Sequence, residues 1–397
     1  MKNDTCMIPV DRKVTVLGST GSVGSQSMDV IRRHNIPVVG ISGGRNVAAL
    51  EEQIREFHPA YCAVADERAA ADLKLRVKDT DTEIFAGTEG VCTVAQAGDS
   101  TMVLNSILGN AGLRPTLAAI EAGRDLALSN KETLVTAGEI VMAQAKRRGV
   151  RVLPVDSEHC AIYQCLNGEN RARVKKLILT CSGGPFFGYT EKQLSAVTVD
   201  QTLAHPTWKM GAKITVDCAT LMNKGLELIE AVRLFGVAPR QIEIVIHRES
   251  IIHSMVEYID HAVLAQLSVP DMRLCVQYAL TCPDRAPSPL APLDLCSVGA
   301  LTFQKPDEQT FSLLRLARQA VEIGGTATAT LNGANEAAVQ LFIQRKISFL
   351  EIAQLVEQVV RGTTHIASPD LEQIEAADSD ARRRVYETVG TKVPGEE

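Results

Sequence analysis

The chain has 397 residues, 45% of them hydrophobic, a length that predicts about two or three domains. Its formal net charge of −6 argues against a nucleic-acid-binding protein, because such a protein needs a basic face. No apolar run reaches the roughly 18 residues of a membrane span, and residues 1–12 lack the pattern of a signal peptide. The ten cysteines form no C-x-x-C pair, so we expect reduced thiols in a cytoplasmic protein rather than disulfides or a zinc site.

A glycine loop stands near the start of the chain. Residues 14–17 form an apolar run that predicts a buried strand, Gly18-Ser-Thr-Gly21-Ser-Val-Gly24 follows at once, and residues 25–33 have helical character. Strand, glycine loop and helix is the context in which a dinucleotide pyrophosphate approaches the backbone and the helix N-terminus. A simple turn is the alternative explanation.

The next predicted strand, residues 36–42, indicates which dinucleotide is bound. An NAD site needs an acid about 20 residues beyond the glycines to bind the ribose 2′-hydroxyl. The sequence instead has Gly44, Arg45 and Asn46. A cation there suits a 2′-phosphate, so we predict NADP(H); a solvated arginine is the alternative.

Strands and helices then alternate, which predicts a parallel, doubly wound sheet with ligands beyond the carboxyl ends of its strands. The expected strands are residues 61–65, 101–106 and 125–129, and the expected helices are residues 47–57, 113–122 and 133–148. Lys131 follows one of these strands, where it either reaches a bound substrate or phosphate or is a charged residue of the first helical turn.

Acids follow the strand predicted at residues 151–155. In an extended chain residues two apart point the same way, so Asp156 and Glu158 are expected to face one cation, unless Glu158 is an ordinary acid in the first turn of a helix. Helical spacing over residues 213–230 places Asn223, Glu227 and Glu230 on or near one face, although a solvated face is the usual explanation. If Glu227 joins the first two acids, their oxygens suit Mg²⁺ or Mn²⁺.

Between these acids lie two further segments of interest. A strand at residues 174–180 runs into Cys181-Ser182-Gly-Gly-Pro185, a small turn suited to wrapping an anion. Residues 205–211 contain the only tryptophan, Trp208, and resemble a lid that excludes water. A tryptophan packed in a core is the alternative.

The last third is expected to be mainly supportive. Strands are predicted at residues 242–246 and 263–267, a proline-rich linker follows, and helices are predicted over residues 311–360, with a turn at residues 332–336 and another helix after Ser368. The expected domains are 1–155 for NADPH binding, 156–285 for catalysis and dimerisation with a lid near 203–212, a linker at 286–310, and a helical domain at 311–397.

Eight segments, in order along nearly the whole chain, resemble the motif series of the 1-deoxy-D-xylulose 5-phosphate reductoisomerase family, the second enzyme of non-mevalonate isoprenoid biosynthesis. They are residues 18–24, 129–133, 153–159, 182–185, 205–211, 222–227, 252–256 and 270–273. The resemblance implies a Rossmann-like NADP-binding domain, a central α+β catalytic domain whose sheet pairs two subunits in a homodimer, and a C-terminal helical bundle.

The resemblance also implies roles for individual residues. NADPH would contact Thr20, Gly21, Ser22, Val23, Gly44, Arg45, Asn46, Asn130, Glu132, Met210, Gly211 and Met272. A divalent ion (Mg²⁺, Mn²⁺ or Co²⁺) would be bound by Asp156, Glu158 and Glu227, which with Lys131 and His205 are the expected catalytic residues. The sugar-phosphate substrate would lie among Lys131, Ser157, Glu158, Ser182, His205, Trp208, Cys218, Asn223, Lys224 and Glu227.

Several positions depart from the family pattern. Cys218 stands where serine is expected, so the phosphate loses a strong hydroxyl donor. Arg45 replaces lysine and keeps the charge, while Ser129, Cys181, Phe187 and Ala212 also differ, the last by removing a positive charge from the lid. The implied activity is metal-dependent, NADPH-linked reductive isomerisation of 1-deoxy-D-xylulose 5-phosphate to 2-C-methyl-D-erythritol 4-phosphate.

Two other functions stay open at this point. One is an NADP-dependent dehydrogenase of a small phosphorylated or carboxylated aldehyde, without skeletal rearrangement. The other is a non-catalytic sensor of a nucleotide or sugar phosphate, which would not need three convergent acids.

Overall fold

The computed structural model describes residues 12–204 and 210–393, and the chain divides into two compact units. Unit 1 comprises Met1–Thr133, Val141–Cys160 and Asp271–Ala291. Unit 2 comprises Leu134–Ile140, Ala161–Pro270 and Pro292–Glu397. The division into domains at residues 155, 285 and 310 stays a prediction.

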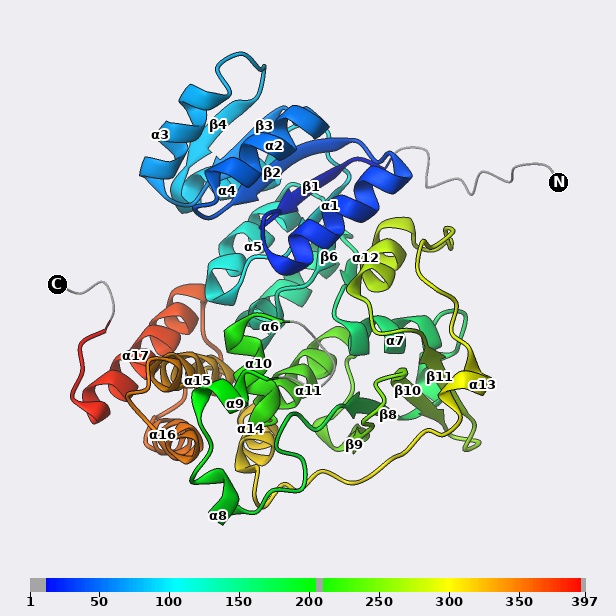
Figure 1. The fold of residues 1–397 in the computed structure, drawn as a ribbon, viewed down its shortest axis with the longest axis vertical. Coiled ribbons are helices and arrows are strands. Elements are labelled where there is room, and N and C mark those ends of the chain that lie inside the picture. Colours follow the sequence, from blue (N-terminus) through cyan, green and yellow to red (C-terminus); the bar gives the residue numbers. More distant parts are fainter. Residues whose placement is uncertain (1–11, 205–209, 394–397) are drawn as a thin grey trace. The chain divides into compact units, whose positions relative to one another are not determined.

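Unit 1 contains a seven-stranded sheet in the order β4-β3-β2-β1-β5-β6-β7, and every neighbouring pair is parallel (Figure 1). Its strands are β1 (Val14–Leu17), β2 (Val38–Gly43), β3 (Tyr61–Val64), β4 (Glu83–Ala86), β5 (Met102–Asn105), β6 (Asp125–Leu128) and β7 (Val152–Pro154). The order reverses at β1, so right-handed crossovers place helices on both faces. The predicted parallel, doubly wound sheet is confirmed.

The helices of unit 1 begin and end where the sequence provides caps. They are α1 (Ser22–His34), α2 (Val47–Phe57), α3 (Glu67–Arg76), α4 (Gly87–Gln96), η1 (Gly109–Gly112), α5 (Leu113–Glu121) and α12 (Met272–Thr281). Asn46 and Asp66 accept backbone N–H groups at the starts of α2 and α3, which satisfies otherwise unpaired donors of the first turn. Helices α6 (Lys131–Arg148) and α7 (Ser157–Cys165) contribute to both units, and α6 is kinked at Ala137 (φ −125°, ψ 23°).

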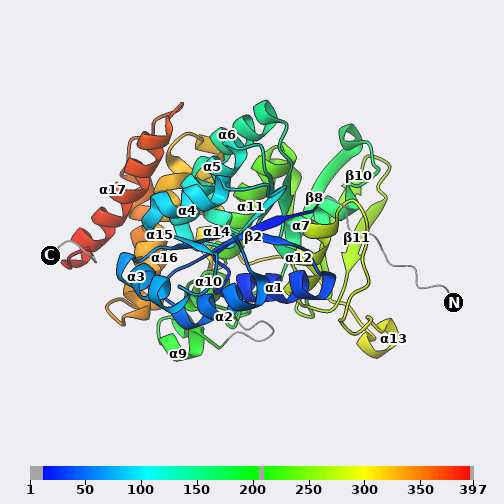
Figure 2. The same cartoon turned by 90° about the horizontal axis from the view of Figure 1, so that it is seen from above.

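Unit 2 contains a four-stranded sheet in the order β11-β10-β8-β9, in which only β8 and β9 are parallel. Its strands are β8 (Val174–Cys181), β9 (Ile242–Ile246), β10 (Ile252–Tyr258) and β11 (Val263–Leu267). Strands β8, β10 and β11 lie side by side in Figure 2. The expected β9 and β11 are confirmed, whereas the sequence did not predict β10 between them.

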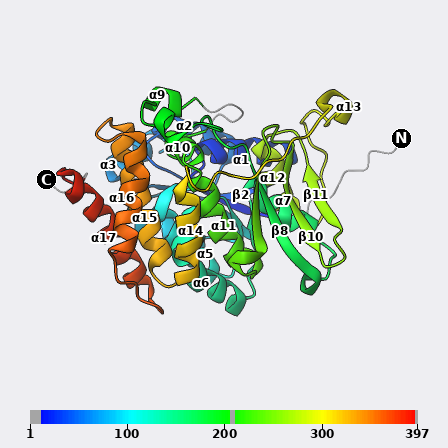
Figure 3. The same ribbon diagram turned by 90° about the horizontal axis from the view of Figure 1, so that it is seen from below.

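Helices make up the rest of unit 2. They are η2 (Arg171–Arg173), α8 (Glu191–Leu194), α9 (Val199–Thr202), α10 (Ala212–Ala219), α11 (Met222–Phe235), η3 (Pro239–Gln241), α13 (Leu295–Val298), α14 (Ser312–Ile323), α15 (Ala327–Ile343), α16 (Phe349–Arg361) and α17 (Leu371–Val389). Figure 3 shows α14 to α17 gathered in the C-terminal helical region. The Phe342 and Phe349 rings pack in a T-shaped arrangement, with ring centroids 5.9 Å apart, as part of one apolar core. Among the described residues, no helix is both long and apolar enough to cross a membrane.

Two predicted elements are wrong in detail. The helix expected over residues 213–230 is broken into α10 and α11 at Leu221, whose φ of 60° is left-handed. The turn expected at residues 332–336 lies inside α15. The helix expected after Ser368 is confirmed as α17.

Candidate active site

The glycine loop after β1 has the tight geometry that a dinucleotide requires. Gly18 has a φ of +79°, and a side chain on Gly24 would bring its Cβ to 2.1 Å from the Gly18 carbonyl oxygen. Gly21 precedes α1, and no side chain among the described residues caps that helix. The N–H groups of the first turn, which includes Ser22 and Val23, are therefore suited to phosphate oxygens.

The loop after β2 presents a cation at the same carboxyl edge of the unit 1 sheet. The Arg45 side chain is 86% exposed, and its Nε lies 3.1 Å from Asp66 Oδ2 in the loop after β3. The Ala69 N–H and the Arg45 guanidinium both lower the pKa of Asp66. Gly44 and Asn46 flank Arg45 and are exposed, so this corner can receive an anion.

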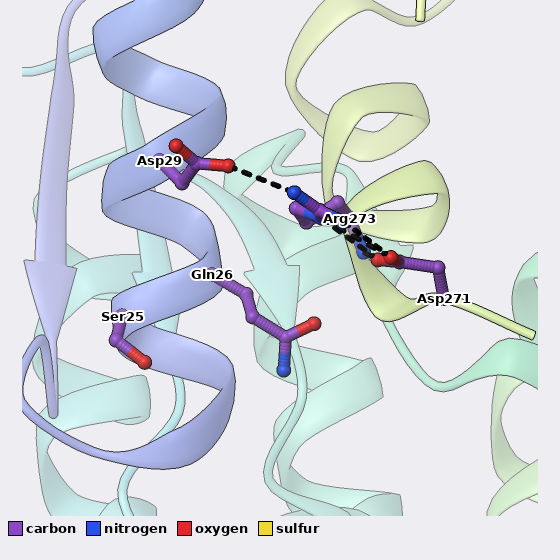
Figure 4. A pocket seen from close by; sticks show the side chains of 5 residues that line it. All are labelled: Ser25, Gln26, Asp29, Asp271 and Arg273. Carbon is purple, nitrogen blue, oxygen red and sulfur yellow. Dashed lines mark hydrogen bonds and ion pairs between the residues drawn. The ribbon is translucent and has the colours of Figure 1, made fainter. Parts of the chain in front are cut away.

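A hollow of about 280 Å³ lies between α1 and the start of α12 (Figure 4). It is lined by Ser25, Gln26, Asp29, Asp271 and Arg273. The Arg273 guanidinium donates to Asp271 at 2.6 Å and to Asp29 at 3.2 Å, as the dashed lines show. This ion pair joins the start of α12 to α1, so Met272, the first residue of α12, lies near the helix that follows the glycine loop.

Asn130 begins α6 and is occupied by the protein itself. Its side chain accepts the Thr133 N–H at 2.9 Å and donates to the Ile107 carbonyl at 2.7 Å. It also donates to the Glu132 carboxylate at 3.1 Å. Asn130 and Glu132, both expected to contact the cofactor, therefore hold the loops after β5 and β6 together.

Lys131 and Asp156 form a buried ion pair in unit 1. Their side chains are 11% and 6% exposed. Burial alone would raise the pKa of the Asp156 carboxyl, but the Lys131 ammonium and the His159 ring outweigh it and hold the pKa well below its usual range. Asp156 is therefore an anion at neutral pH, as an ion ligand must be.

Glu158 lies in the first turn of α7, so the extended geometry expected for Asp156 and Glu158 is wrong. Asp156 Oδ1 instead accepts the backbone N–H groups of Glu158 at 3.2 Å and His159 at 3.3 Å. The Ser157 hydroxyl donates to the Glu158 carboxylate. The structure thus gathers all three expected residues of the 156–158 segment at the start of one helix.

Helix α11 carries a second buried group of polar residues in unit 2. The side chain of Glu227 is 1% exposed and that of Lys224 is 3% exposed, and the two form an ion pair. Asn223 Nδ2 donates to Glu227 Oε1 at 2.6 Å. Glu230 is also fully buried, so the alternative of a solvated, charged helix face is wrong.

The Ser182 loop (residues 181–187) lies next to the end of α10. A side chain on Gly184 would bring its Cβ to 2.6 Å from the Cys218 carbonyl oxygen. Burial and the Glu227 carboxylate raise the pKa of the Cys218 thiol well above its usual value. Cys218 is therefore a neutral thiol, a weak donor that does not repel an anion.

The remaining expected residues are at the start of α10 or before it. Gly211 is the residue before α10 and its carbonyl accepts the Thr215 N–H at 3.1 Å. Met210 is half-buried. His205 and Trp208, and with them most of the expected lid, lie outside the described residues.

Two buried polar residues beside expected site residues were missed from the sequence. His159 is fully buried, with Nδ1 3.1 Å from Asp156 Oδ1. Asp217 is also buried and pairs with Lys213 at 2.8 Å, while accepting from Asn335 Nδ2 at 2.8 Å. The spacing of three residues on a helix could have indicated His159, whereas no local signal links Asp217 to Asn335, 118 residues away.

Comparison with known families covers most of the chain. The family model described as 1-deoxy-D-xylulose 5-phosphate reductoisomerase matches residues 14–138. The models of its C-terminal domains match residues 152–235 and 267–384. The chain is similar to the 1-deoxy-D-xylulose 5-phosphate reductoisomerases of Caldanaerobacter subterraneus (50% identical, covering 94% of this chain and 98% of the relative) and Symbiobacterium thermophilum (52% identical, covering 93% and 96%).

Solved structures give the same result. The chain is similar to the 1-deoxy-D-xylulose 5-phosphate reductoisomerase of Zymomonas mobilis in complex with NADPH, with a TM-score of 0.90, 39% identity, and coverage of 96% of this chain and 100% of that one. It is similar to a DOX-P reductoisomerase in complex with NADPH, fosmidomycin and magnesium, with a TM-score of 0.91, 38% identity, and coverage of 96% and 98%.

Proposed function

The chain belongs to the 1-deoxy-D-xylulose 5-phosphate reductoisomerase family, and on that basis we propose that it converts 1-deoxy-D-xylulose 5-phosphate into 2-C-methyl-D-erythritol 4-phosphate with NADPH and a divalent metal ion. The observation that carries this proposal is the match of family models to three successive parts of the chain. Related structures hold NADPH and magnesium. A dehydrogenase without rearrangement is not favoured.

The acids fit a hard divalent cation. Asp156 and Glu227 are buried carboxylates, and each forms an ion pair with a lysine ammonium. A buried carboxylate is stable only beside a positive charge, so both positions favour a cation. We assign Asp156 and Glu158 of unit 1 and Glu227 of unit 2 as its ligands, because three carboxylates suit Mg²⁺, Mn²⁺ or Co²⁺ better than a soft ion. When bound by these three acids, such an ion would act as a Lewis acid towards the substrate oxygens.

The chain's own residues orient the reactants. His159 and Lys131 keep Asp156 ionised, and Ser157 holds Glu158. Ser182, Cys218, Asn223 and Lys224 are assigned to the substrate phosphate, a remote group whose binding orients the reacting carbons. His205 is assigned to the substrate and Trp208 to the lid.

The N-terminal residues bind the cofactor. The first turn of α1, with Thr20 to Val23, receives the pyrophosphate, and Arg45 with Gly44 and Asn46 receives the 2′-phosphate. Asn130 and Glu132 shape the neighbouring loops, while Met210, Gly211 and Met272 are assigned to the nicotinamide end. When bound there, NADPH would supply the hydride for the reduction.

The decisive experiment follows NADPH oxidation with 1-deoxy-D-xylulose 5-phosphate, with and without Mg²⁺ or Mn²⁺, and identifies the product. We expect metal-dependent turnover to the branched polyol phosphate. An unbranched alcohol would support a plain dehydrogenase, and NADPH oxidation that persists after chelation and dialysis would refute the metal assignment.

We also propose a homodimer formed through the unit 2 sheet. Strand β11 is an edge strand, and its Val263 and Leu264 are 47% and 41% exposed. An apolar sheet edge favours pairing with another chain. Light scattering should give twice the chain mass for the wild type and a smaller mass for Leu264→Lys. A cytosolic location is proposed as well, because the nine described cysteines are all free thiols.

A further inference from the structure

The turn between β9 and β10 holds the Ser182 loop through one arginine. Arg248 Nη1 donates to the carbonyl oxygens of Ser182 at 2.6 Å and of Gly184 at 2.8 Å. The same guanidinium lies over the Phe187 ring, 5.2 Å from its centroid. The Arg248 side chain therefore contacts three residues of the loop.

The Ser182 loop needs such a partner because its backbone is unusually free. Gly183 and Gly184 have φ values of +77° and +69°, a left-handed pair that only glycine adopts readily and that loses much conformational entropy when fixed. A charged donor that serves two carbonyls forms stronger hydrogen bonds than a neutral one. Arg248 thus supplies the order that the loop sequence lacks.

The loop geometry also fixes the Ser182 side chain. The Gly184 N–H donates to Ser182 Oγ at 3.3 Å, so the oxygen acts as an acceptor there and its hydrogen is directed elsewhere. Because Gly184 lies against the Cys218 carbonyl, the loop conformation also sets the distance between Ser182 and the end of α10. A change in this conformation would therefore separate two residues assigned to the phosphate.

Arg248 itself is held in place by its neighbour. The His247 N–H donates to the Cys181 carbonyl at 2.7 Å. His247 Nε2 accepts the backbone N–H groups of Ile251 at 3.2 Å and Ile252 at 3.1 Å, and the ring is fully buried. The turn is thereby tied to the end of β8, so that Arg248 approaches the loop from a rigid base.

We propose that Arg248 is a positioning residue for the substrate phosphate: it holds the Ser182 loop in the conformation that presents Ser182, beside Cys218, to that phosphate. The inference rests on the proposed function, since it assumes a phosphorylated substrate at this loop. Arg248 acts through the loop carbonyls and does not need to touch the phosphate. Its removal leaves the loop to be ordered by substrate binding, which weakens binding rather than the chemical step.

The test compares Arg248→Met and Arg248→Lys with a matched control. Arg318 is also half-buried in unit 2, and its Nη1 likewise donates to two carbonyls, those of Pro239 at 2.7 Å and Ile242 at 3.2 Å. Arg318→Met therefore removes the same kind of contact from a different turn. Steady-state kinetics with NADPH and 1-deoxy-D-xylulose 5-phosphate is measured for each variant, together with NADPH Kd and thermal midpoint.

We expect Arg248→Met to raise the KM for the sugar phosphate on the order of 10- to 100-fold, which is the range for losing a hydrogen bond to a charged group. The kcat should change by less than about 3-fold and the NADPH Kd should stay unchanged. Arg248→Lys should lie between, because lysine keeps the charge but not the planar fork. Arg318→Met should lower the thermal midpoint without changing this KM. A wild-type KM in both Arg248 variants refutes the inference, and if Arg248→Met does not fold, the Lys variant decides in the same way.

Hydrogen exchange of the substrate-free proteins separates positioning from direct phosphate binding. Positioning predicts that the amides of Gly183, Gly184, Phe186 and Phe187 exchange faster in Arg248→Met, by about tenfold, while Arg318→Met affects the amides of residues 240–242 instead. Unchanged exchange with a raised KM would mean that Arg248 binds the phosphate itself, which overturns the positioning role. Absence of turnover in the wild type would instead refute the proposed function, so the two failures are distinguishable.

Discussion

Arg45 is the residue on which we expect the choice of NADPH over NADH to depend. In an NAD site the corresponding loop carries an acid that would repel a 2′-phosphate. Here the guanidinium is 86% exposed and pairs with Asp66, at 3.1 Å. Arg45→Ala should therefore weaken NADPH binding and leave NADH binding nearly unchanged.

The magnitude follows from the exposure of the side chain. A hydrogen bond to a charged group contributes about 1.5–3 kcal/mol. Arg45 is exposed and already paired with Asp66, so only the lower end of that range should appear as affinity. A loss of about 1.5 kcal/mol corresponds to a rise of roughly tenfold in the KM for NADPH.

The assay measures KM and kcat for NADPH and NADH separately, with Asp66→Asn as the matched control. Asp66 Oδ1 accepts the Ala69 N–H at 3.0 Å, and asparagine preserves that helix cap while it removes the charge opposite Arg45. Asp66→Asn should improve NADPH binding by about 2-fold, because Arg45 no longer has a competing partner. Equal changes for both cofactors in Arg45→Ala would refute the reasoning, since they would show that Arg45 acts on loop structure and not on the 2′-phosphate.

Three further outcomes are expected. Glu227→Gln should reduce kcat by more than about 100-fold, since it removes a proposed ion ligand, yet fluorescence titration should give a nearly unchanged NADPH Kd; parallel loss of both would make Glu227 structural. His58 ends α2 with a left-handed φ of 49°, so His58→Gly should raise the free energy of unfolding by about 0.5–1 kcal/mol in urea denaturation, and a loss would show that its side chain is needed. The ammonium groups of Lys175 and Lys176 and the His261 ring lower the pKa of Glu257 to about 2. A lowered carboxyl pKa stabilises the fold above the unfolded-state pKa of about 4.3, and this stabilisation is lost as the pH falls towards 2. The difference in free energy of unfolding between wild type and Glu257→Gln should therefore shrink between about pH 5 and pH 2, and a constant difference would contradict the pairing.

The unit 1 sheet could be predicted from the sequence because its strands are buried on both faces. Strands such as β1 and β5 are fully buried, and such strands read as continuous apolar runs. Strand β4 was missed for the opposite reason. It is an edge strand, and unlike β7 at the other edge it has no buried residue, with both ends at Glu83 and Ala86 exposed, so its sequence carries no buried pattern.

A tertiary contact explains why the turn predicted at residues 332–336 is wrong. In α15 the sequence Asn332-Gly333 predicts a turn, but the Asn332 side chain donates to Asp378 at 2.9 Å. A side chain on Gly333 would bring its Cβ to 2.2 Å from the Asp378 carbonyl oxygen. The glycine permits α17 to approach α15, and that close approach offsets the low helix propensity of the pair. Such a contact cannot be read from residues 46 positions apart.

For the candidate site, the sequence identified the carboxylates but not which lysines neutralise their charge. Asp156 and Glu227 were expected as ligands. The three-residue spacing of Lys224 and Glu227 on α11 could have indicated their ion pair, whereas no local signal links Lys131 to Asp156, 25 residues away. An unpaired carboxylate buried in either unit would strongly destabilise it, so each unit must neutralise its own acid before any ion arrives. The two lysines supply the opposite charge, so neither carboxylate depends on a metal ion for a charged partner. If these acids bind a divalent ion as proposed, the ion must compete with the Lys131 and Lys224 ammonium groups, which is why both lysines belong to the description of the proposed site as much as the acids do.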